Sequence, residues 1–352
     1  MELTAIDLFS GLGGTSLGLQ RAGFRVVAAV ESHELAAESY RLNMDDVHVW
    51  EHDIRKVAAR AVMEGAALAR GELALLAACP PCQGFSTLRT LNGNRRIEDH
   101  RNGLLRDVTR FVRVLKPMTV LAENVPGLAS NAVFDRFIDD LDAIGYKLRH
   151  EVVDVSQYGV PQRRRRLLIV ASRLGEPPVG ERCRQRVTVR RALRGLPEVG
   201  STDDPLHDAP ERRTERIAAM IRLVPPDGGS RRDLGEEHQL DCHTRTDGFK
   251  DIYGRMAWKE VAPTITGGCI NPSKGRFLHP EEHRAITLRE AALLQSFPAD
   301  YQLSLRRGRY AAAELIGNAL PPEFVRRHAL ALRHHIESVN GADRSDDRSS
   351  VA

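Results

Sequence analysis

One apolar run that ends at two prolines constrains the fold of this chain more than any other feature. Residues 73–78 are all apolar and follow Gly71, which is typical of a parallel strand buried on both faces. Pro80 and Pro81 must end this strand, because neither can donate a ladder hydrogen bond and both fix φ. Open α/β sheets bind ligands beyond the carboxyl ends of their strands. Cys82 is therefore predicted to lie at a ligand site.

The spacing of Cys79 and Cys82 is also that of a redox pair or of half a zinc site. Two intervening prolines and the lack of a thioredoxin-like context argue against a redox pair. A zinc site needs a second pair of ligands. The other candidate ligands, which form no second tight pair, are His238, Cys242, His243 and Cys269. A small buried thiol suits Cys79 better than Cys82, so we expect a metal-free site in which Cys82 is the reactive group.

A glycine-rich turn, Ser-Gly-Leu-Gly-Gly at 10–14, joins the first predicted strand to a helix. Such a turn lets the backbone approach a nucleotide-like ligand and points a helix N-terminus at it. The second strand ends at Glu31, about 20 residues after Gly11, where an acidic residue commonly binds ribose hydroxyls. Ser16 occupies the third position of the NAD-binding pattern G-x-G-x-x-G, so a NAD-dependent Rossmann enzyme is disfavoured.

Strands and helices alternate along the first half of the chain, as a doubly wound sheet requires. The predicted strands are 3–9, 26–30, 73–78, 118–122, 147–155 and 167–171. The predicted helices are 15–22, 33–43, 55–70, 102–116 and 131–144. Beyond Ser172 the sequence becomes irregular, with an amphipathic helix at 211–223, a capped helix that starts after Thr287 with Glu290 at its third position, and a last helix at 323–337. The expected fold is α/β, a doubly wound Rossmann-like sheet with a smaller irregular domain.

Composition limits the class of protein. A chain of 352 residues with 42% hydrophobic and 28% charged residues is typical of a globular protein with one or two domains. No apolar run approaches the roughly 20 residues of a membrane span, and the sequence starts directly with a strand-like segment. Five scattered cysteines favour a reducing, cytoplasmic compartment. The net charge of +4 is compatible with nucleic-acid binding.

Residues 80–86, Pro-Pro-Cys-Gln-Gly-Phe-Ser, resemble the nucleophile motif of the bacterial DNA (cytosine-5) methyltransferase family. The resemblance covers roughly residues 4–172 and 253–330, with the motifs in the family's order. Its other motifs are the S-adenosylmethionine loop at 7–14, Glu-Asn-Val at 123–125, Q-x-R-x-R at 162–166 and the segment 316–322. The resemblance implies a catalytic domain at 1–178, completed by 311–338, and a target-recognition domain at 179–310. The polar segment 340–352 is predicted to be a disordered tail.

The resemblance also implies a reaction, in which the Cys82 thiolate adds to carbon 6 of a flipped-out cytosine and carbon 5 receives the methyl group of S-adenosylmethionine. The implied catalytic residues are Cys82, Glu123, Arg164 and Arg166. The implied cofactor-binding residues are Phe9, Gly11, Leu12, Gly13, Gly14, Glu31, Asp53, Ile54, Pro80 and Asn318. For Asp53 the residues alone offer a second interpretation, the N-cap of the helix that starts near Arg55.

DNA contacts are expected in three places: the polar segment 83–101, which would close over the flipped base, the arginine run at 163–166, and the irregular domain. The predicted residues are Gln83, Ser86, Arg89, Arg96, Arg101, Gln162, Arg163, Arg165, Arg231, Arg232, Arg245 and Thr264. Strand alternation puts Arg164 and Arg166 on one face and their neighbours on the other.

The expected partner is double-stranded DNA with a short specific site. The enzyme is expected to act as a monomer in the bacterial cytoplasm, either alone or beside a restriction endonuclease for the same site. Two alternatives are a transfer-RNA substrate, as in one branch of the family, and a DNA-binding protein without catalysis. Residues 84–86 favour the DNA-modifying form, and the presence of Cys82, Glu123 and Arg166 favours an active enzyme.

Overall fold

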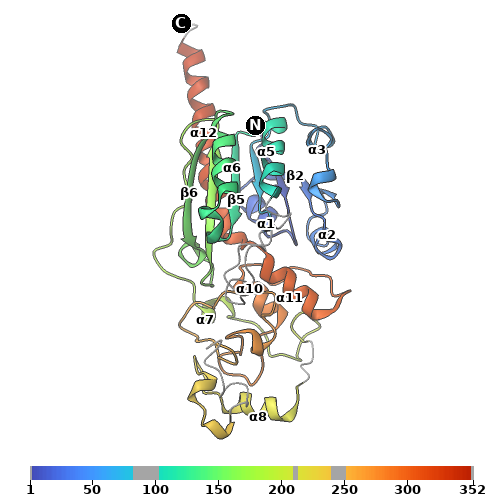
Figure 1. The fold of residues 1–352 in the computed structure, drawn as a ribbon, viewed down its shortest axis with the longest axis vertical. Helices are drawn as coiled ribbons and strands as arrows, with labels where there is room; N and C mark the ends of the chain where they lie inside the picture. The colour runs from blue at the N-terminus through green and yellow to red at the C-terminus, as the bar shows by residue number, and fades with distance from the viewer. Residues whose placement is uncertain (1, 82–102, 209–212, 239–250, 350–352) are drawn as a thin grey trace. The chain divides into compact units, whose positions relative to one another are not determined.

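The computed structural model describes residues 2–81, 103–208, 213–238 and 251–349, and the chain forms two compact units (Figure 1). Unit 1 comprises Met1–Tyr158, Arg165–Arg182 and Leu320–Ala352. Unit 2 comprises Gly159–Arg164 and Cys183–Ala319. The division of functions between a catalytic and a target-recognition domain stays a prediction.

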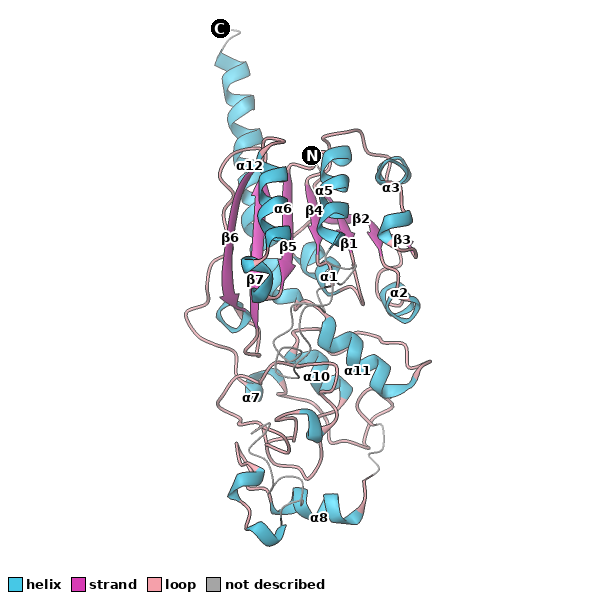
Figure 2. Cartoon of the chain, in the orientation of Figure 1, coloured by secondary structure: helices cyan, strands magenta, loops and turns pink. Residues whose placement is uncertain are grey.

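Unit 1 is built on a seven-stranded sheet with the order β3-β2-β1-β4-β5-β7-β6 (Figure 2). Strands β1 to β5 pair in parallel, whereas β7 runs antiparallel to both β5 and β6. The strands are β1 (Thr4–Leu8), β2 (Arg25–Val30), β3 (His48–Trp50), β4 (Leu75–Ala78), β5 (Thr119–Asn124), β6 (Lys147–Asp154) and β7 (Arg165–Ser172). The predicted α/β fold with a Rossmann-like sheet is confirmed.

Helices cover both faces of this sheet, with α5 and α6 on one face and α12 on the other (Figure 2). The helices of unit 1 are α1 (Gly14–Arg21), α2 (Glu34–Arg41), α3 (Ala59–Gly65), α5 (Leu104–Leu115), α6 (Ala132–Asp142) and α12 (Pro322–Ser349). Its 3-10 helices are η1 (Ile54–Lys56), η4 (Pro126–Ser130) and η5 (Val155–Tyr158).

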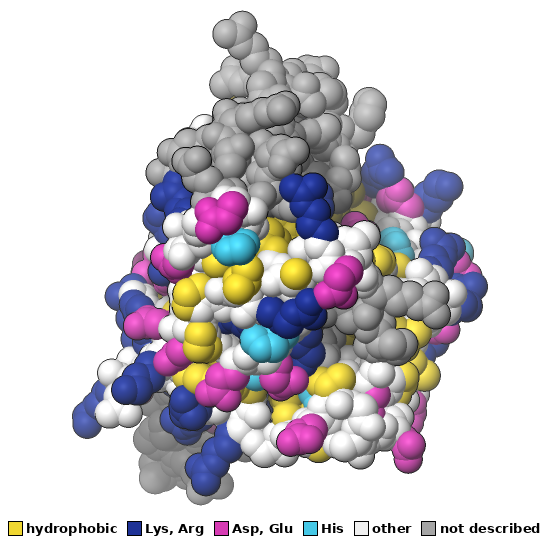
Figure 3. All heavy atoms as spheres, turned by 90° about the horizontal axis from the view of Figure 1, so that it is seen from below, with side chains coloured by type: hydrophobic (Ala, Val, Ile, Leu, Met, Phe, Trp, Pro, Cys, Tyr) yellow, Lys and Arg dark blue, Asp and Glu magenta, His cyan; other side chains and the backbone are white. Residues whose placement is uncertain are grey.

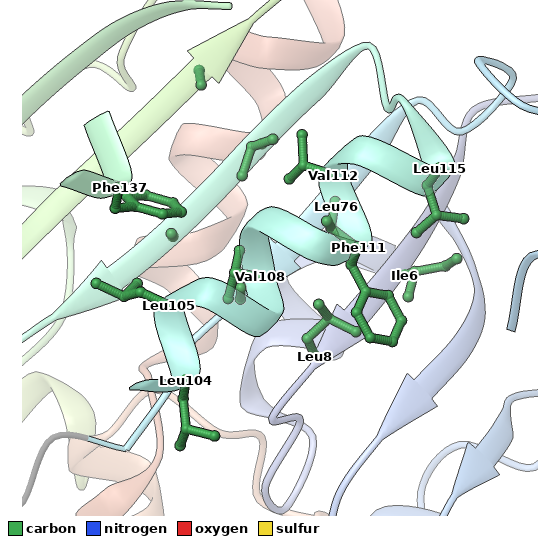
Figure 4. Packing of buried hydrophobic residues seen from close by; sticks show 14 of the residues in the cluster. Ile6, Leu8, Leu76, Leu104, Leu105, Val108, Phe111, Val112, Leu115 and Phe137 are labelled. Atoms are coloured by element: carbon green, nitrogen blue, oxygen red, sulfur yellow. The ribbon is translucent and has the colours of Figure 1, made fainter. Parts of the chain in front are cut away.

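Helix α5 shows why these residues form a helix at this place. Its apolar residues recur at helical spacing, and all except the partly buried Val114 are buried: Leu104, Leu105, Val108, Phe111, Val112 and Leu115. They pack against Ile6, Leu8 and Leu76 of the central strands (Figure 4). The helix ends at Lys116, which adopts a left-handed φ of +48° just before Pro117. The contact holds the carboxyl ends of β1 and β4 in register.

The last helix completes unit 1 by packing against the first. A Cβ atom added to Gly18 of α1 would lie 2.5 Å from the Cβ atom of Val325 and 2.6 Å from the carbonyl oxygen of Pro322. Glycine therefore lets α1 and α12 approach closely. Further along α12, buried His328 accepts a hydrogen bond from the Gly180 amide at 2.9 Å, and desolvation lowers its pKa to about 3. This imidazole is thus neutral in the folded protein.

A Gly18→Ala variant is expected to lower the free energy of unfolding by about 1–3 kcal/mol, because the new methyl group overpacks the contact with α12. Urea denaturation monitored by circular dichroism would measure the change. Gly103→Ala is the matched control, since Gly103 has a negative φ and an added Cβ would have no atom of the described ranges within 4 Å. That variant should stay within about 0.5 kcal/mol of the parent. Equal effects of the two substitutions would contradict the prediction.

Helix α12 is longer than the sequence suggests. It extends from Pro322 to Ser349, whereas the predicted helix ends at 337 and polarity alone predicts a disordered tail at 340–352. The segment after Pro322 contains no further proline, and Gly341 is its single glycine. Polar residues are compatible with a helix when neither breaker intervenes. The helix therefore occupies most of the predicted tail.

Unit 2 consists of short helices joined by long loops. Its α-helices are α7 (Val189–Ala192), α8 (Glu215–Leu223), α10 (Leu288–Leu294) and α11 (Gly308–Asn318). Its 3-10 helices are η6 (Arg231–Asp233), η7 (Glu236–His238) and η8 (Pro272–Lys274). The predicted capping box at α10 is confirmed, because the Thr287 hydroxyl accepts from the Glu290 amide and the Glu290 carboxylate accepts from the Thr287 amide.

A buried arginine organises the loops of unit 2. Arg255 is fully buried, and its guanidinium donates to the carbonyl oxygens of Ile221, Val224 and His279, each at 2.9 Å, and also to that of Glu282. Loop carbonyls that no strand or helix satisfies would otherwise carry the full cost of desolvation. This one side chain thus joins the end of α8 to the segment before α10.

Candidate active site

The candidate site lies where β1, β2, β4 and β5 of unit 1 end. Glu123 and Asn124 are the last two residues of β5, and both are buried. The Asn124 amide group donates to the carbonyl oxygen of Pro80 at 3.1 Å, which fixes the chain beyond β4 beside the end of β5. Cys82 follows Pro80 by two positions and lies outside the described residues. The chain thus approaches Cys82 from a point anchored next to Glu123.

Arg166 forms an ion pair with Glu123. Its Nε atom lies 2.5 Å from Glu123 Oε1, and the two side chains are only 16% and 11% exposed. Arg166 reaches this position from β7, which pairs antiparallel with β5. Ion pairs shielded from water are little screened by salt, and they hold both groups in place. The arrangement offers a carboxylate of fixed orientation next to a cation.

Cys79 behaves as a structural thiol. It lies just beyond β4, and its sulfur is 3.7 Å from the Thr15 hydroxyl. Desolvation, followed by the negative charges of Glu123 and Asp7, raises the pKa of this thiol well above its usual range. Only the thiolate is nucleophilic, so the environment of Cys79 makes it unreactive. The interpretation of Cys79 as a small structural thiol fits these surroundings.

The glycine-rich turn after β1 adopts strained backbone angles. Phe9, Gly11 and Gly13 all have positive φ values of +61°, +55° and +98°, and the Gly13 amide donates to the Ser10 carbonyl oxygen at 2.9 Å. Phe9 is the unusual member, because bulky non-glycine residues rarely adopt this region and those that do are often found at functional sites. Leu12 and Gly14 of the same predicted cofactor set are buried. The turn leads directly into α1.

Glu31 is tied to this turn. Its Oε2 atom accepts the Gly11 amide at 2.8 Å, and its Oε1 atom accepts the His33 amide at 2.7 Å. Each carboxylate oxygen can accept more than one hydrogen bond, so both retain a lone pair for a further donor. Two such oxygens suit the paired hydroxyl groups of a ribose. The structure thus brings Glu31 and the glycine-rich turn together.

Asp53 caps the 3-10 helix η1, as one of its two interpretations predicts. Its Oδ1 atom accepts the Arg55 amide at 3.0 Å, and the Arg55 guanidinium, through a direct hydrogen bond, lowers the pKa of Asp53 to about 2. The neighbouring Ile54 is buried, and its carbonyl oxygen accepts from Arg110 at 2.7 Å. Contact of Asp53 or Ile54 with a cofactor stays a prediction.

The arginine run alternates as predicted. Arg163 and Arg165 are exposed, whereas Arg164 is buried and Arg166 is partly buried. Arg166 belongs to unit 1, where it contacts Glu123. Arg164 belongs to unit 2, where its guanidinium donates to the carbonyl oxygens of Ile265 at 3.0 Å and Gly317 at 2.8 Å. These bonds favour a structural role for Arg164, and its predicted catalytic role stays untested.

The Gln162 side chain also forms its hydrogen bonds within unit 2. The side chain is completely buried, its Nε2 atom donates to Gln295 Oε1 at 2.6 Å, and its Oε1 atom accepts the Ile265 amide at 2.7 Å. A direct DNA contact would require this amide to give up partners on both sides. The described geometry therefore favours a structural role over the predicted DNA contact. Thr264, another predicted contact, donates its hydroxyl hydrogen to the Arg163 carbonyl oxygen at 2.8 Å.

The remaining predicted residues are distributed as follows. Asn318 is exposed at the end of α11 in unit 2, Arg232 is exposed, and Arg231 is buried. Those outside the described residues are Gln83, Ser86, Arg89, Arg96, Arg101 and Arg245. On the face shown in Figure 3, Lys and Arg side chains are interspersed with Asp and Glu. The described ranges contain no group of three or more possible metal ligands and no helix able to cross a membrane.

Sequence reasoning assigned no role of their own to three residues at or near these features. Asn124 anchors Pro80, Gln295 holds Gln162, and Asp7 forms a buried hydrogen bond with Ser16. Asn124 and Asp7 both stand at the carboxyl end of an otherwise apolar strand, and a polar residue there was a usable signal. Gln295 follows an apolar helix and carried no comparable signal.

Comparisons with known proteins agree with this geometry. Residues 3–334 match the family described as C-5 cytosine-specific DNA methylase. The chain is 34% identical to the Type II methylase M.HgiDII of Herpetosiphon aurantiacus, over 96% of this chain and 97% of the relative. It is 33% identical to the Type II methyltransferase M1.BsuMI of Bacillus subtilis, over 92% of this chain and 78% of the relative.

Among solved structures, a protein described as a DNA modification methyltransferase encoded within an Escherichia coli prophage has a similar fold. Its TM-score is 0.74 at 23% identity, and the match covers 96% of this chain and all of the other. The DNMT2 structure of Spodoptera frugiperda matches with a TM-score of 0.61 at 18% identity, over 94% of this chain and 99% of the other. These two matches establish a shared fold.

Proposed function

Because this chain belongs to the C-5 cytosine-specific DNA methylase family and is a DNA (cytosine-5-)-methyltransferase, we propose that Cys82 and Glu123 act together on one flipped-out cytosine. The Cys82 thiolate adds to carbon 6, which turns the ring into an enamine with electron density on carbon 5. A stacked base cannot enter such a site, so the target cytosine must leave the helix.

The ion pair between Glu123 and Arg166 carries this proposal. The carboxyl group of Glu123 is buried at the end of β5, at a fixed position beside the chain that leads from Pro80 to Cys82. In this role the carboxyl group of Glu123, protonated when the cytosine is bound, donates its hydrogen to nitrogen 3 and so neutralises the negative charge that develops on the ring, and it accepts a hydrogen bond from the cytosine amino group. Arg166 fixes the orientation of the carboxyl group. After carbon 5 has received the methyl group, a base, which a water molecule can provide, removes the carbon-5 proton, the bond between Cys82 and carbon 6 breaks, and the thiolate leaves.

The residues around the glycine-rich turn fit S-adenosylmethionine, which supplies a methyl group on a sulfonium centre when bound. Glu31 offers two preorganised carboxylate oxygens for a ribose, and the turn at Gly11 leaves room for the ligand, since an added Cβ would meet no atom of the described residues within 4 Å. One Asp7 oxygen has no hydrogen-bond partner among the described residues. The further residues proposed to hold the cofactor are Phe9, Leu12, Gly13, Gly14, Asp53, Ile54, Pro80 and Asn318.

The proposed substrate is a short specific site in double-stranded DNA, bound by a monomer in the bacterial cytoplasm. Exposed Arg163, Arg165 and Arg232 would bind phosphates, which makes affinity fall with salt. The names of the relatives support a place in a Type II restriction-modification system beside a cognate endonuclease, and the alternative is an orphan methylase that acts alone.

Expression in a bacterial host that lacks DNA methylation, followed by bisulfite sequencing of the host DNA, tests the proposal. Protected cytosines should occur in one short sequence context and be absent from the host with an empty vector. Modification must also depend on Glu123, so the Glu123→Gln protein is sequenced in parallel. Unmodified DNA from a folded protein that binds S-adenosylmethionine would reject the DNA substrate. Equal modification by Glu123→Gln would reject the proposed role of that residue.

A further inference from the structure

A buried hydrogen-bond chain connects three elements beneath the glycine-rich turn. Asp7 is the fourth residue of β1 and is completely buried, on the face of the strand opposite Ile6 and Leu8. Its Oδ2 atom accepts the Ser16 hydroxyl of α1 at 2.7 Å. The oxygen of that hydroxyl lies 2.8 Å from the hydroxyl of Tyr40 in α2. Since Ser16 has one hydroxyl hydrogen, Tyr40 donates to Ser16 and Ser16 donates to Asp7.

This chain links the two segments that carry the candidate cofactor contacts. The turn at 9–13 lies between Asp7 and Ser16, and the segment 31–33 directly precedes the helix that contains Tyr40. Glu31 in turn holds Gly11. A displacement of either helix would therefore move the turn and the Glu31 carboxylate relative to each other.

The carboxyl group of Asp7 is poised to gain or lose a proton near neutral pH. Desolvation and, to a smaller extent, the negative charge of nearby Glu31 raise its pKa to about 7, against the Ser16 hydrogen bonds that lower it. Its Oδ1 atom has no hydrogen-bond partner in the described part of the chain. The neighbouring groups are Ser16 of α1, Tyr40 of α2, Glu31 after β2 and the Cys79 thiol after β4, and none of them supplies a compensating cation.

We propose that Asp7 is a further positioning residue of the cofactor site, which holds α1 and α2 in place and releases its proton to solvent when a cationic cofactor binds. The inference rests on the proposed use of S-adenosylmethionine, which carries a sulfonium and an ammonium cation. A positive charge nearby favours the ionised form of a carboxyl group. An ionised Asp7 would in turn strengthen the hydrogen bond from Ser16 and so tighten the turn around the cofactor.

Isothermal titration calorimetry tests the proton release. S-adenosylmethionine is titrated into the full-length protein at pH 7 in phosphate and in Tris, which differ in ionisation enthalpy. With a pKa of about 7 in the unliganded protein, roughly half a proton should be released per bound cofactor. Release should vanish in Asp7→Asn, with affinity about tenfold weaker, the equivalent of one pKa unit. Tyr40→Phe is the matched control, since it keeps the carboxyl group and should keep the proton release.

A second ligand separates the effect of the sulfonium charge on proton release from the effect of the ligand's shape. S-adenosylhomocysteine lacks the sulfonium charge, so wild-type protein should release less proton with it, and Asp7→Asn should weaken its binding less. Cofactor binding with the same heat in both buffers, or with unchanged release in Asp7→Asn, would overturn the inference and leave the proposed function intact. No binding of either ligand would overturn both.

The pH dependence of stability is a check that does not depend on ligand. The folded-state pKa of Asp7, about 7, lies above its ordinary value of 3.8, so the folded protein binds the extra proton between these values. The Asp7 carboxyl group should therefore lower the free energy of unfolding of the wild-type protein as pH rises from about 4 to about 7. Asp7→Asn should lack that loss and melt higher than wild type at pH 8. A lower melting temperature of Asp7→Asn at pH 8 would contradict the assigned ionisation.

Discussion

A Cys82→Ala variant is expected to lose DNA methylation by at least about 10⁴-fold, because no other group can form the bond to carbon 6 that activates carbon 5. Transfer of a labelled methyl group to DNA, measured in a single turnover, would show the loss. The variant should still bind S-adenosylmethionine and DNA, since the thiol contributes little to the affinity for either. Retention of methylation within tenfold of wild type would reject Cys82 as the nucleophile.

Cys79→Ala is the matched control for this experiment, because it removes a thiol only three positions away. Its environment keeps Cys79 protonated through desolvation and the negative charges of Glu123 and Asp7. We therefore expect activity within about tenfold of wild type, and a loss of stability near 1 kcal/mol from the smaller side chain. Equal inactivation of the two variants would point to a packing defect instead of lost chemistry.

Glu123→Gln is expected to lower kcat by about 10²–10⁴-fold, the usual contribution of a positioned acid or base. Glutamine keeps the size of the side chain but cannot donate the proton of a carboxylic acid, and it leaves Arg166 without its ion-pair partner. Single-turnover methyl transfer at saturating DNA and cofactor isolates the chemical step from binding.

Glu151→Gln provides the control for the charge change. Glu151 lies on β6, which β7 separates from β5, and pairs with Arg182 at 3.3 Å, with 57% of the arginine side chain exposed. Such a pair contributes little, so both kcat and the melting temperature should stay close to those of wild type. If Glu123→Gln melted far below Glu151→Gln, the loss of activity would reflect unfolding, and binding of S-adenosylmethionine would have to be compared before assigning a catalytic role.

Much of unit 1 could be predicted from local sequence. The apolar run 73–78, the glycine-rich turn and the periodic helix at 104–115 all carry their own signals, and in unit 2 so does the capping box of Thr287 and Glu290. The direction of β7 could not be predicted, because an apolar strand has the same pattern in a parallel and in an antiparallel pair. That direction depends on the chain's path between β6 and β7.

The residues of the candidate site could be predicted from the family's motifs. The role of a residue could not be predicted where it depends on a hydrogen-bond partner far along the chain. The Q-x-R-x-R motif predicts a DNA contact for Gln162, whereas its side chain is buried and donates a hydrogen bond to Gln295, 133 positions away. Arg164 likewise depends on carbonyl groups more than 100 positions along the chain. Hydrogen bonds of this range leave no trace in local spacing, whereas alternation correctly separated Arg164 and Arg166 from their neighbours.

The contact between α1 and α12 has a consequence for how the protein folds while it is synthesised on the ribosome. Unit 1 needs both Gly18 and Val325, so about 160 residues must be synthesised after Tyr158 before its last helix exists. At roughly 5–20 residues per second, that delay amounts to about 10–30 s, during which the nascent sheet lacks its α12 cover. A message truncated before α12 would thus yield a chain with every catalytic motif and an unprotected apolar face, a substrate for chaperones and proteases.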